Sequence, residues 1–270
     1  MNRYKILKSG LIKVLEIGKI RISMLLENKN ILVTGGSRGI GRTISLRLAE
    51  EGANIIINYS KSNSDAKNLL DMLNTDCNQK HEVIQADVSK EEDIALLMQQ
   101  IESHYGNLDV IVNNAGSTKF IEHSDLKRHD SSILDEMYKV HFRGSFLCIK
   151  YAESLLRKSF QPSIVNIASI ASITATGSNI AYCAMKAAVV NMTKSLARVL
   201  APIRVNAISP GLVDTELTKE WKDYRKKQID LTPLNVLTTT ADVANEVLHL
   251  ILSDNITGQN IVVDGGRILN

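Results

Sequence analysis

Short apolar runs alternate with longer amphipathic segments along the chain from Asn30 onward. Seven runs are rich in β-branched residues and nearly continuous in apolarity, which is typical of strands buried on both faces of a parallel sheet. These predicted strands are Asn30–Thr34, Asn54–Asn58, Glu82–Ala86, Asp109–Val112, Ser163–Ala168, Arg204–Ile208 and Asn260–Val263. The segments between them predict helices near 40–51, 62–74, 90–105, 132–159, 180–200 and 240–252. Such alternation indicates an α/β fold with a doubly wound parallel sheet and right-handed crossovers.

The sequence shows no boundary between two domains. Its 270 residues suit a single open α/β domain, and its four prolines mark no linker. Hydrophobic residues make up 44% and charged residues 23%, values that exclude disordered, collagen-like and coiled-coil chains. The segment from Gly211 to about Thr239 is the least periodic, and we predict that it forms a mobile lid.

The excess positive charge is confined to the start of the chain. The formal net charge is +3, but residues 1–23 hold six basic and one acidic side chain, a net of +5. Residues 24–270 hold 26 basic and 28 acidic side chains, a net of −2. The larger part therefore gives no electrostatic reason to expect a nucleic-acid partner.

Three interpretations of this basic leader are open. It is a basic amphipathic helix that touches a membrane surface or a partner, a targeting segment, or an upstream extension foreign to the native chain. We favour the third, because Met24 begins MLLENKNILVTGG, a natural opening of the first strand. No apolar run is long enough to span a bilayer, so membrane contact is expected only through the leader.

The three cysteines, Cys77, Cys148 and Cys183, are scattered and have no metal-ligand spacing. Their odd number argues against a disulfide framework, and reduced thiols are the rule in the cytoplasm. We therefore expect a cytoplasmic protein with no metal site.

A glycine-rich turn follows the first predicted strand and opens the next helix. It reads Thr34-Gly35-Gly36-Ser37-Arg38-Gly39-Ile40-Gly41. Glycines let the backbone approach a pyrophosphate, and the helix N-terminus adds free N–H groups and a positive dipole end. The spacing differs both from the commonest dinucleotide fingerprint and from the P-loop. Its place between strand and helix nevertheless predicts a dinucleotide site.

The loop is similar to the cofactor motif of the short-chain dehydrogenase/reductase family, and further motifs extend this resemblance over about residues 28–267. They are the NNAG sequence at 113–116, Tyr182-x-x-x-Lys186 with Ser169 thirteen residues before the tyrosine, PGLVDT at 210–215, and TGQ and DGG near the end of the chain. In overall pattern, the chain is nearest to the 3-oxoacyl-(acyl-carrier-protein) reductase subgroup. The resemblance implies a Rossmann-type, nicotinamide-dependent oxidoreductase that is a homo-oligomer, with a tetramer favoured.

The resemblance also implies which residues hold the nicotinamide dinucleotide. They are Gly35, Ser37, Arg38, Gly39, Ile40, Gly41, Tyr59, Ser60, Asp87, Val88, Asn113, Ala115, Gly116, Tyr182, Lys186, Pro210, Gly211, Val213 and Thr215. For two of them another role is open: Asp87 is well placed to cap the following helix, and Asn113 either holds the adenosine ribose or stabilises the central strand.

The residue at the end of the second predicted strand indicates whether NAD(H) or NADP(H) binds. NAD-preferring members usually have an acidic residue there, but this chain has Tyr59. Without a carboxylate to repel a 2′-phosphate, Arg38, Ser60 and Lys61 are positioned to bind one by charge-assisted hydrogen bonds. We therefore predict NADP(H) rather than NAD(H). The alternative is that Arg38 and Lys61 are ordinary surface charges.

Tyr182 and Lys186 stand four residues apart in a helical segment, so they share one face. An adjacent ammonium favours the tyrosinate, and we expect it to lower the pKa of Tyr182 toward the working range. In the family's mechanism, hydride passes between the nicotinamide and the carbonyl carbon, while Tyr182 transfers the proton, Ser169 holds the substrate oxygen and Lys186 binds the nicotinamide ribose. Ser172 competes for the serine role but lies three residues from the usual place. Cys183 is expected to serve packing.

One position departs from the family pattern. An asparagine thought to hold a proton-relay water is usual in N-x-x-G-x-F, but this chain reads His141-Phe142-Arg143-Gly144-Ser145-Phe146. Histidine both donates and accepts hydrogen bonds, so His141 is a candidate for the relay or for an altered pH profile. The alternative is a hydrogen-bonded structural histidine.

The substrate is expected to be a small carbonyl or alcohol compound, bound near residues 212–237 and the loop after Gly116. Candidates for an apolar wall are Leu212, Leu217, Trp221 and Leu234. An acyl carrier protein is a possible partner, with Arg157 and Lys158 as candidate contacts, although the short loop at Ala201-Pro202 lacks the subgroup's usual arginine. Sugar, polyol or other alcohol substrates are the alternative, and a non-catalytic cofactor-binding regulator is a third class.

Overall fold

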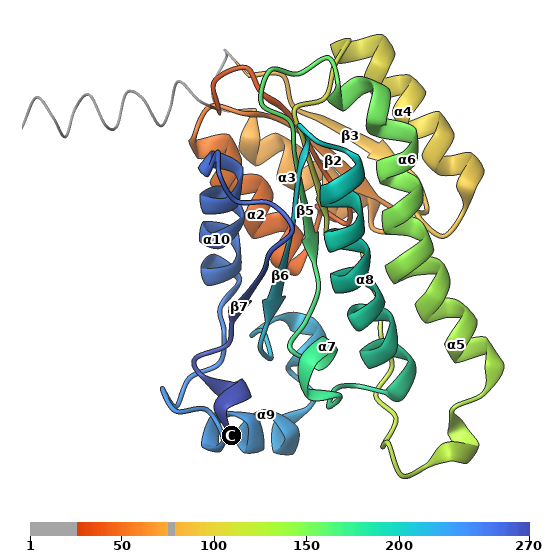
Figure 1. Cartoon of the computed structure of the whole chain (residues 1–270), viewed down its shortest axis with the longest axis vertical. Coiled ribbons are helices and arrows are strands. Elements are labelled where there is room, and N and C mark those ends of the chain that lie inside the picture. Colours follow the sequence, from red (N-terminus) through yellow and green to blue (C-terminus); the bar gives the residue numbers. More distant parts are fainter. Residues whose placement is uncertain (1–25, 75–78) are drawn as a thin grey trace, which may run out of the picture.

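The computed structural model describes residues 26–74 and 79–270 (Figure 1). The leader at 1–23 and Cys77 lie outside the described residues, so the expectations for them stay predictions. No helix within the described ranges has the length and apolar character needed to cross a membrane.

The centre of the molecule is a parallel sheet of seven strands in the order β3-β2-β1-β4-β5-β6-β7. The strands are β1 (Asn30–Val33), β2 (Asn54–Tyr59), β3 (Glu82–Gln85), β4 (Val110–Asn113), β5 (Ser163–Ile167), β6 (Arg204–Pro210) and β7 (Asn260–Val263). From β1 the strands run outward through β2 to β3, and β4 then lies on the other side of β1. This topology confirms the predicted Rossmann-type α/β fold with a single domain.

Helices cover both faces of the sheet (Figure 1). The longer ones are α2 (Gly39–Glu50), α3 (Asn63–Leu73), α4 (Glu91–Tyr105), α6 (Gly144–Leu156), α8 (Ile180–Val199) and α10 (Thr240–Leu252). Side chains of α2, α3 and α10 pack on one face in a cluster that includes Ile31 and Val33. Those of α4, α6 and α8 pack on the other face with Leu32. Neighbouring residues of β1 thus point to opposite faces, and all are buried, because both faces are covered.

The long helix predicted near 132–159 is interrupted. It consists of α5 (Ser131–Met137), a π-helical turn η2 (Tyr138–Arg143) and α6. Such turns insert a residue into a helix and occur often at functional sites. The periodicity did not reveal this turn, because apolar residues continue through it; the turn carries His141, which is buried.

The segment at 211–239, predicted as a lid of low periodicity, contains two helical pieces. They are η3 (Glu216–Thr218) and α9 (Lys222–Asp230). No apolar periodicity marks α9, because the residue that it buries is the polar Gln228. A second short helix that the pattern missed, α7 (Ala171–Thr174), follows β5.

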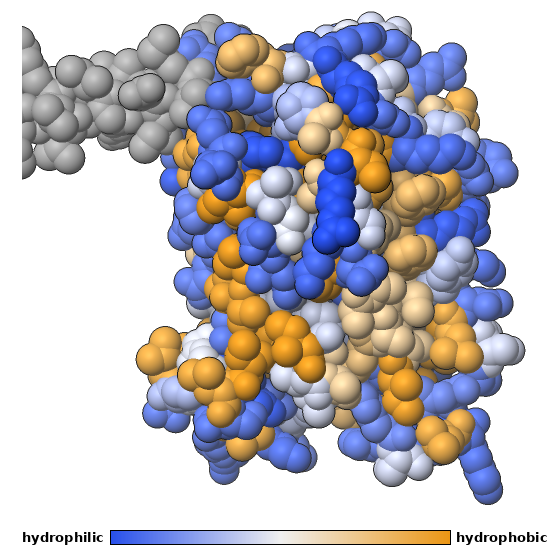
Figure 2. Space-filling view, viewed as in Figure 1, coloured by the Kyte–Doolittle hydropathy of each residue, from blue (hydrophilic) through white to orange (hydrophobic). Residues whose placement is uncertain are grey.

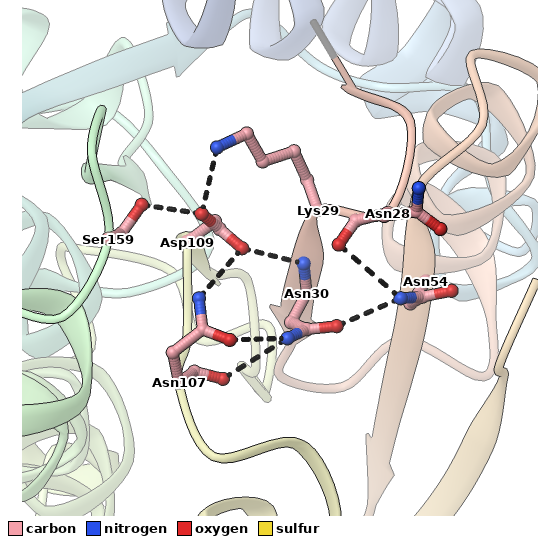
Figure 3. Close-up of polar contacts among 7 residues, drawn as sticks. All are labelled: Asn28, Lys29, Asn30, Asn54, Asn107, Asp109 and Ser159. Atoms are coloured by element: carbon pink, nitrogen blue, oxygen red, sulfur yellow. Dashed lines mark hydrogen bonds and ion pairs between the residues drawn. The ribbon is translucent and has the colours of Figure 1, made fainter. Parts of the chain in front are cut away.

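The amino ends of three strands meet in a polar cluster around Asp109 (Figure 3). The Asp109 carboxylate accepts hydrogen bonds from Lys29 Nζ at 3.0 Å, Asn30 N–H at 2.9 Å, Asn107 Nδ2 at 3.2 Å and Ser159 Oγ. Asn30 also accepts from Asn54 Nδ2 at 2.9 Å, so the cluster ties β1, β2 and the start of β4 together. All these contacts lie at the edge opposite the carboxyl ends of the strands.

Arg157 and Lys158, predicted as contacts for an acyl carrier, lie at this amino edge. Lys158 Nζ donates to Gly106 O at 3.1 Å and pairs with Glu102 at 2.9 Å, while Arg157 pairs with Glu153 at 2.8 Å. Sites in open parallel sheets form at the carboxyl edge, so these two residues are on the wrong side of the molecule for that role. The prediction was wrong because these residues end the helix before β5, and a helix that leads into a parallel strand ends at the amino edge of the sheet.

Replacing Asp109 by alanine is expected to destabilise the fold by about 2 kcal/mol, because the buried N–H of Asn30 and the half-buried amide of Asn107 lose their acceptor. The midpoint of urea unfolding measures this effect. Asp71→Ala is the matched control, since Asp71 is exposed on α3 and should change stability by less than about 0.5 kcal/mol. Equal midpoints for the two variants would contradict the structural role of the cluster.

Candidate active site

The glycine-rich loop joins β1 to α2 at the carboxyl edge of the sheet. Gly35 and Gly39 have positive φ angles of 60° and 51°, which side chains rarely allow. A Cβ on Gly41 would lie 2.3 Å from the Gly35 carbonyl oxygen. The N-cap residue of α2, Arg38, makes no side-chain cap, so the first N–H groups of the helix remain available to an anion. This cradle fits the pyrophosphate of a dinucleotide.

Two residues that sequence reasoning did not single out hold the loop in place. Asn114 Nδ2 donates to the carbonyl oxygens of Thr34 at 3.0 Å and Gly35 at 3.1 Å. The Thr34 hydroxyl in turn accepts from the N–H groups of Asn114 and Ala115, both at 3.0 Å. The loop after β4 therefore clamps the loop after β1. Asn114 was present in the NNAG sequence, but only the pairing of β1 with β4 shows what it holds.

Asn113 lies inside the sheet. It is 4% exposed, and its Nδ2 donates to Asn166 Oδ1 on β5 at 2.9 Å. Asn166 Nδ2 continues the chain to Thr193 Oγ1 on α8, also at 2.9 Å. Of the two roles considered for Asn113, this arrangement corresponds to stabilising the central strand, and it links β4 and β5 to α8.

The region beyond the end of β2 is where an adenosine 2′-phosphate would lie. Tyr59 is largely buried. Its hydroxyl donates to Asn63 Oδ1 at 3.0 Å and so ties the end of β2 to the first residue of α3. Ser60 is exposed. The Arg38 side chain is 71% exposed and its Nε lies 3.7 Å from Asp65 Oδ2, a weak surface pair that leaves the guanidinium accessible.

Asp87 follows β3 at the same edge. Its Oδ1 accepts from Ser89 N–H at 3.0 Å, and its own N–H donates to Asp93 Oδ2 at 2.9 Å. Because α4 begins at Glu91, the carboxylate forms a local turn rather than the helix cap considered from the sequence. Val88 is 7% exposed and its carbonyl lies under Gly144, where a Cβ would come within 2.7 Å.

A cavity of about 200 Å³ opens at the carboxyl ends of β4, β5 and β6. Ser169, Tyr182, Lys186 and His141 all line it. Ser169 lies two residues beyond β5, and Tyr182 lies in the first turn of α8, whose N-cap Asn179 accepts from Tyr182 N–H at 2.7 Å. The nucleotide cradle borders the same cavity through residues Ile40, Asn114, Gly116, Pro210, Gly211, Val213 and Thr215.

The ionisation of Tyr182 and Lys186 differs from the sequence-based expectation. Burial raises the pKa of Tyr182 to about 12, although a hydrogen bond with Ser169 lowers it in part. Burial also lowers the pKa of Lys186 to about 8. Lys186 Nζ lies 5.7 Å from the tyrosine ring centre and donates to Ile167 O at 2.7 Å. Desolvation is the largest cause of both shifts, and the Lys186 charge is not among the causes that lower the pKa of Tyr182.

Ser172, the alternative to Ser169, and Cys183, the neighbour of Tyr182, do not line the cavity. Ser172 is absent from its lining, and the Ser172 hydroxyl donates to Ser169 O at 2.6 Å, so it braces the turn that presents Ser169. Cys183 is buried and its Sγ packs against Gly177, where a Cβ would meet it at 2.9 Å. Burial also raises the pKa of Cys183, which suits packing rather than nucleophilic chemistry.

His141 is held between the loop after β4 and the tyrosine. Its ring meets the ring of Tyr182 edge-on, with centres 5.3 Å apart. Nε2 lies 2.7 Å from Ser117 O, and a carbonyl only accepts, so Nε2 carries the proton. Nδ1 is then an acceptor, and it has no partner within the described part of the chain. Burial and the nearby Lys186 charge lower the pKa of His141 to about 3, which keeps the ring neutral.

His141→Asn is expected to keep activity, because an amide also offers both a donor and an acceptor in this buried place. His141→Leu is expected to lower kcat by about tenfold, the loss of one good hydrogen-bond partner. Steady-state kinetics of the two variants measure this difference. An unimpaired leucine variant would remove His141 from the mechanism and leave it a packing residue.

The lid contributes a wall to the cavity. Leu212 and Trp221 line it as predicted, whereas Leu234 is 70% exposed and the side chain of Leu217 lies outside the described residues. Tyr224 and Gln228 also line it, and the sequence pattern did not indicate them. Phe120 packs on Trp221 and Tyr224 with ring centres 5.6 Å and 5.5 Å apart, so the lid rests on the loop after β4. No cluster of side chains suited to a metal ion occurs in 26–74 or 79–270.

Comparison with known proteins gives consistent matches. The family model described as Enoyl-(Acyl carrier protein) reductase matches residues 35–267. The chain is 36% identical over 248 residues to the 3-oxoacyl-[acyl-carrier-protein] reductase FabG of Staphylococcus epidermidis, covering 90% of this chain and 100% of that protein.

Solved structures agree with these matches. The short-chain dehydrogenase/reductase from Serratia marcescens superposes with a TM-score of 0.83 at 32% identity, covering 90% of this chain and 98% of that one. A short chain dehydrogenase from Burkholderia cenocepacia in complex with NADP gives a TM-score of 0.83 at 29% identity, covering 90% of this chain and 99% of that one.

Proposed function

The chain is an oxidoreductase that belongs to the short-chain dehydrogenase/reductase family and is similar to 3-oxoacyl-[acyl-carrier-protein] reductases, and from this premise we propose that it reduces a ketone to a secondary alcohol with NADPH. We propose a 3-oxoacyl thioester as the substrate class. The observation that carries the proposal is the meeting of Ser169, Tyr182 and Lys186 in one cavity beside the glycine cradle.

In this proposal Ser169 and Tyr182 act on the carbonyl oxygen of the substrate, and Lys186 acts on Tyr182. The glycine cradle at Gly35–Gly41 would hold the nicotinamide cofactor, which would supply the hydride for the carbonyl carbon. The Ser169 hydroxyl donates a hydrogen bond to the carbonyl oxygen, and Tyr182 O–H gives that oxygen its proton as negative charge develops. The Lys186 ammonium stabilises the resulting tyrosinate and has further N–H donors for the nicotinamide ribose.

The ionisation states favour reduction at neutral pH. A tyrosine whose pKa is about 12 is protonated there and ready to act as an acid. Oxidation of an alcohol would instead require the tyrosinate as base, which is scarce at that pH. The pKa of Lys186, about 8, keeps most of the ammonium charge available for reduction near neutrality.

NADP(H) is the proposed cofactor. Arg38 is accessible at the rim of the cradle, and Tyr59 stands where a carboxylate would repel a 2′-phosphate. The complex of the Burkholderia cenocepacia neighbour with NADP supports this choice.

An acyl carrier protein is the proposed donor of the substrate, as the relatives' names suggest. Carriers of this kind are acidic, so a docking surface should be basic and close to the cavity. α9 offers the exposed Lys222, Lys226 and Lys227 beside the lid residues that line the cavity. These lysines replace Arg157 and Lys158 in the proposal.

We further propose a homo-oligomer, with a tetramer favoured. Leu134, Tyr138 and Phe146 form an apolar stripe along α5, η2 and α6 and are 50%, 44% and 41% exposed. A second apolar surface lies around the C-terminus and the loop after α9, where Leu234 and Leu269 are 70% and 78% exposed (Figure 2). Exposed apolar surfaces of this kind mark association sites. Analytical ultracentrifugation tests the state, and we place the protein in the cytoplasm, where free thiols such as Cys148 and Cys183 stay reduced.

The function is tested by NADPH oxidation at 340 nm with a 3-oxoacyl thioester, free and attached to a carrier protein, and with a panel of sugars, polyols and simple ketones. We expect the thioester to have the highest kcat/KM, with a ratio above one for NADPH over NADH. A ratio below one would overturn the cofactor proposal. Preference for a sugar or polyol would indicate another alcohol dehydrogenase, and cofactor binding without turnover of any compound would indicate a regulator.

A further inference from the structure

One face of the lid helix looks into the cavity. Trp221, Tyr224 and Gln228 are spaced by three and four residues, so they share a helical face. All three line the cavity together with Ser169 and Tyr182. The cavity therefore has polar groups both from the β5–α8 side and from α9.

Tyr224 lines the same cavity as Ser169 and Tyr182, and its side chain carries a hydroxyl. Its ring is fixed by Phe120 and Trp221, with centres 5.5 Å and 6.3 Å away. Burial raises the pKa of Tyr224, so the hydroxyl remains a donor at neutral pH. It makes no hydrogen bond to any residue that the structure describes.

Gln228 offers N–H groups from the next turn. It is 8% exposed, and its Oε1 accepts from Arg267 Nε at 2.9 Å. Because a guanidinium only donates, this bond fixes which end of the amide is oxygen and leaves the NH2 group for the cavity. Arg267 is itself anchored, since its Nη1 donates to Asn270 O at 2.9 Å. The C-terminal segment thus orients a donor inside the lid.

We propose that Tyr224 and Gln228 form a donor pair that binds a second oxygen of the substrate, distinct from the carbonyl oxygen at Ser169 and Tyr182. This inference rests on the proposed function and narrows it. A 1,3-dioxo compound, such as a 3-oxoacyl thioester, carries a second carbonyl close to the one that reacts. A carbonyl oxygen accepts two hydrogen bonds, so it matches the N–H groups of Gln228 together with the O–H of Tyr224. A monoketone would leave the pair without a partner, at a cost in binding.

The test uses two ligands that differ only in the second carbonyl: the acetoacetyl thioester of N-acetylcysteamine and the corresponding thioether, in which that carbonyl is a methylene. The wild type is compared with Tyr224→Phe and Gln228→Met, which keep most of the side-chain volume. Asp223→Asn is the control, because Asp223 is exposed on α9 away from the cavity lining. Binding is measured with NADP⁺ present, where no reduction occurs, from the fluorescence of Trp221, the single tryptophan of the chain.

We expect the wild type and Asp223→Asn to bind the thioester more tightly than the thioether. Each cavity variant should weaken thioester binding by about 5- to 10-fold, the effect of one neutral hydrogen bond, and change thioether binding less than about twofold. The same selectivity should appear in kcat/KM with NADPH.

Equal weakening of both ligands, or no weakening of the thioester, would overturn the donor pair. Turnover reports separately on the proposed function. If the wild type distinguishes the ligands in binding, through Tyr224 and Gln228, but reduces neither, then the subsite stands and the proposed reduction fails. If the wild type reduces both ligands equally well, the reduction stands and the subsite fails.

Discussion

Tyr182→Phe is expected to lower kcat for ketone reduction by about 10²- to 10⁴-fold, the usual contribution of a positioned general acid. The change removes a single oxygen atom and leaves the ring, whose edge contact with His141 lies at 5.3 Å between centres. The fold and the glycine cradle should be undisturbed. Dissociation constants for NADPH, measured by fluorescence, are therefore expected to change less than about threefold, a difference of roughly 0.7 kcal/mol.

The pH dependence of kcat/KM for the wild type tests the roles of Tyr182 and Lys186 independently. Reduction needs the protonated phenol, and a Tyr182 pKa of about 12 keeps it protonated over the whole practical range. Lys186 loses its ammonium charge as pH rises through its pKa of about 8. We therefore expect kcat/KM for reduction to be level near pH 6–7 and to fall above about pH 8. A Tyr182→Phe enzyme with near-normal kcat would exclude this tyrosine as the acid.

Gly41→Ala is expected to weaken NADPH binding by about 100-fold, close to 2.8 kcal/mol. A methyl group at this position would lie 2.3 Å from Gly35 O and 2.5 Å from Asn114 Nδ2. Both neighbours belong to the cradle, and Gly35 O is backbone, so the loop itself must move. Movement would break the bond from Asn114 that holds the loop after β1. Isothermal titration with NADPH measures the loss.

Gly106→Ala is the matched control for this substitution. Gly106 has a positive φ of 79°, but a Cβ there meets nothing within 4 Å. It ends α4 at the amino edge of the sheet, far from the cradle, so the change should cost about 1 kcal/mol of stability and leave NADPH binding unaltered. If both variants bind NADPH as the wild type does, the crowding at Gly41 does not shape the cofactor site.

Residues whose roles depend on local sequence could be predicted from the chain alone. Ile31, Leu32 and Val33 form a buried strand because β-branched and apolar side chains follow one another without a polar break. Tyr182 and Lys186 share a face because four residues make about one helical turn. The glycine loop could be predicted because it stands between a strand and a helix. These inferences need only near neighbours in sequence.

Other roles depended on contacts between distant segments. Asn114 and Thr34 are 80 positions apart and meet only because β1 pairs with β4. Tyr224 and Gln228 belong to a helix with no apolar periodicity, so nothing in the pattern of α9 indicated that it covers a cavity. A π-helical turn carries His141 and could not be read from a continuous helical pattern.

The sequence by itself determined the α/β class, the order of strands and helices, the glycine cradle and the identity of the serine, tyrosine and lysine that share a cavity. All of these follow from periodicity and short motifs, which are properties of neighbouring residues. Only the tertiary structure decided how buried those groups are, and therefore that the pKa of Tyr182 is raised to about 12 and not lowered. It also placed α9 over the cavity. Desolvation and position depend on which segments pack together, and packing is a property of the whole fold.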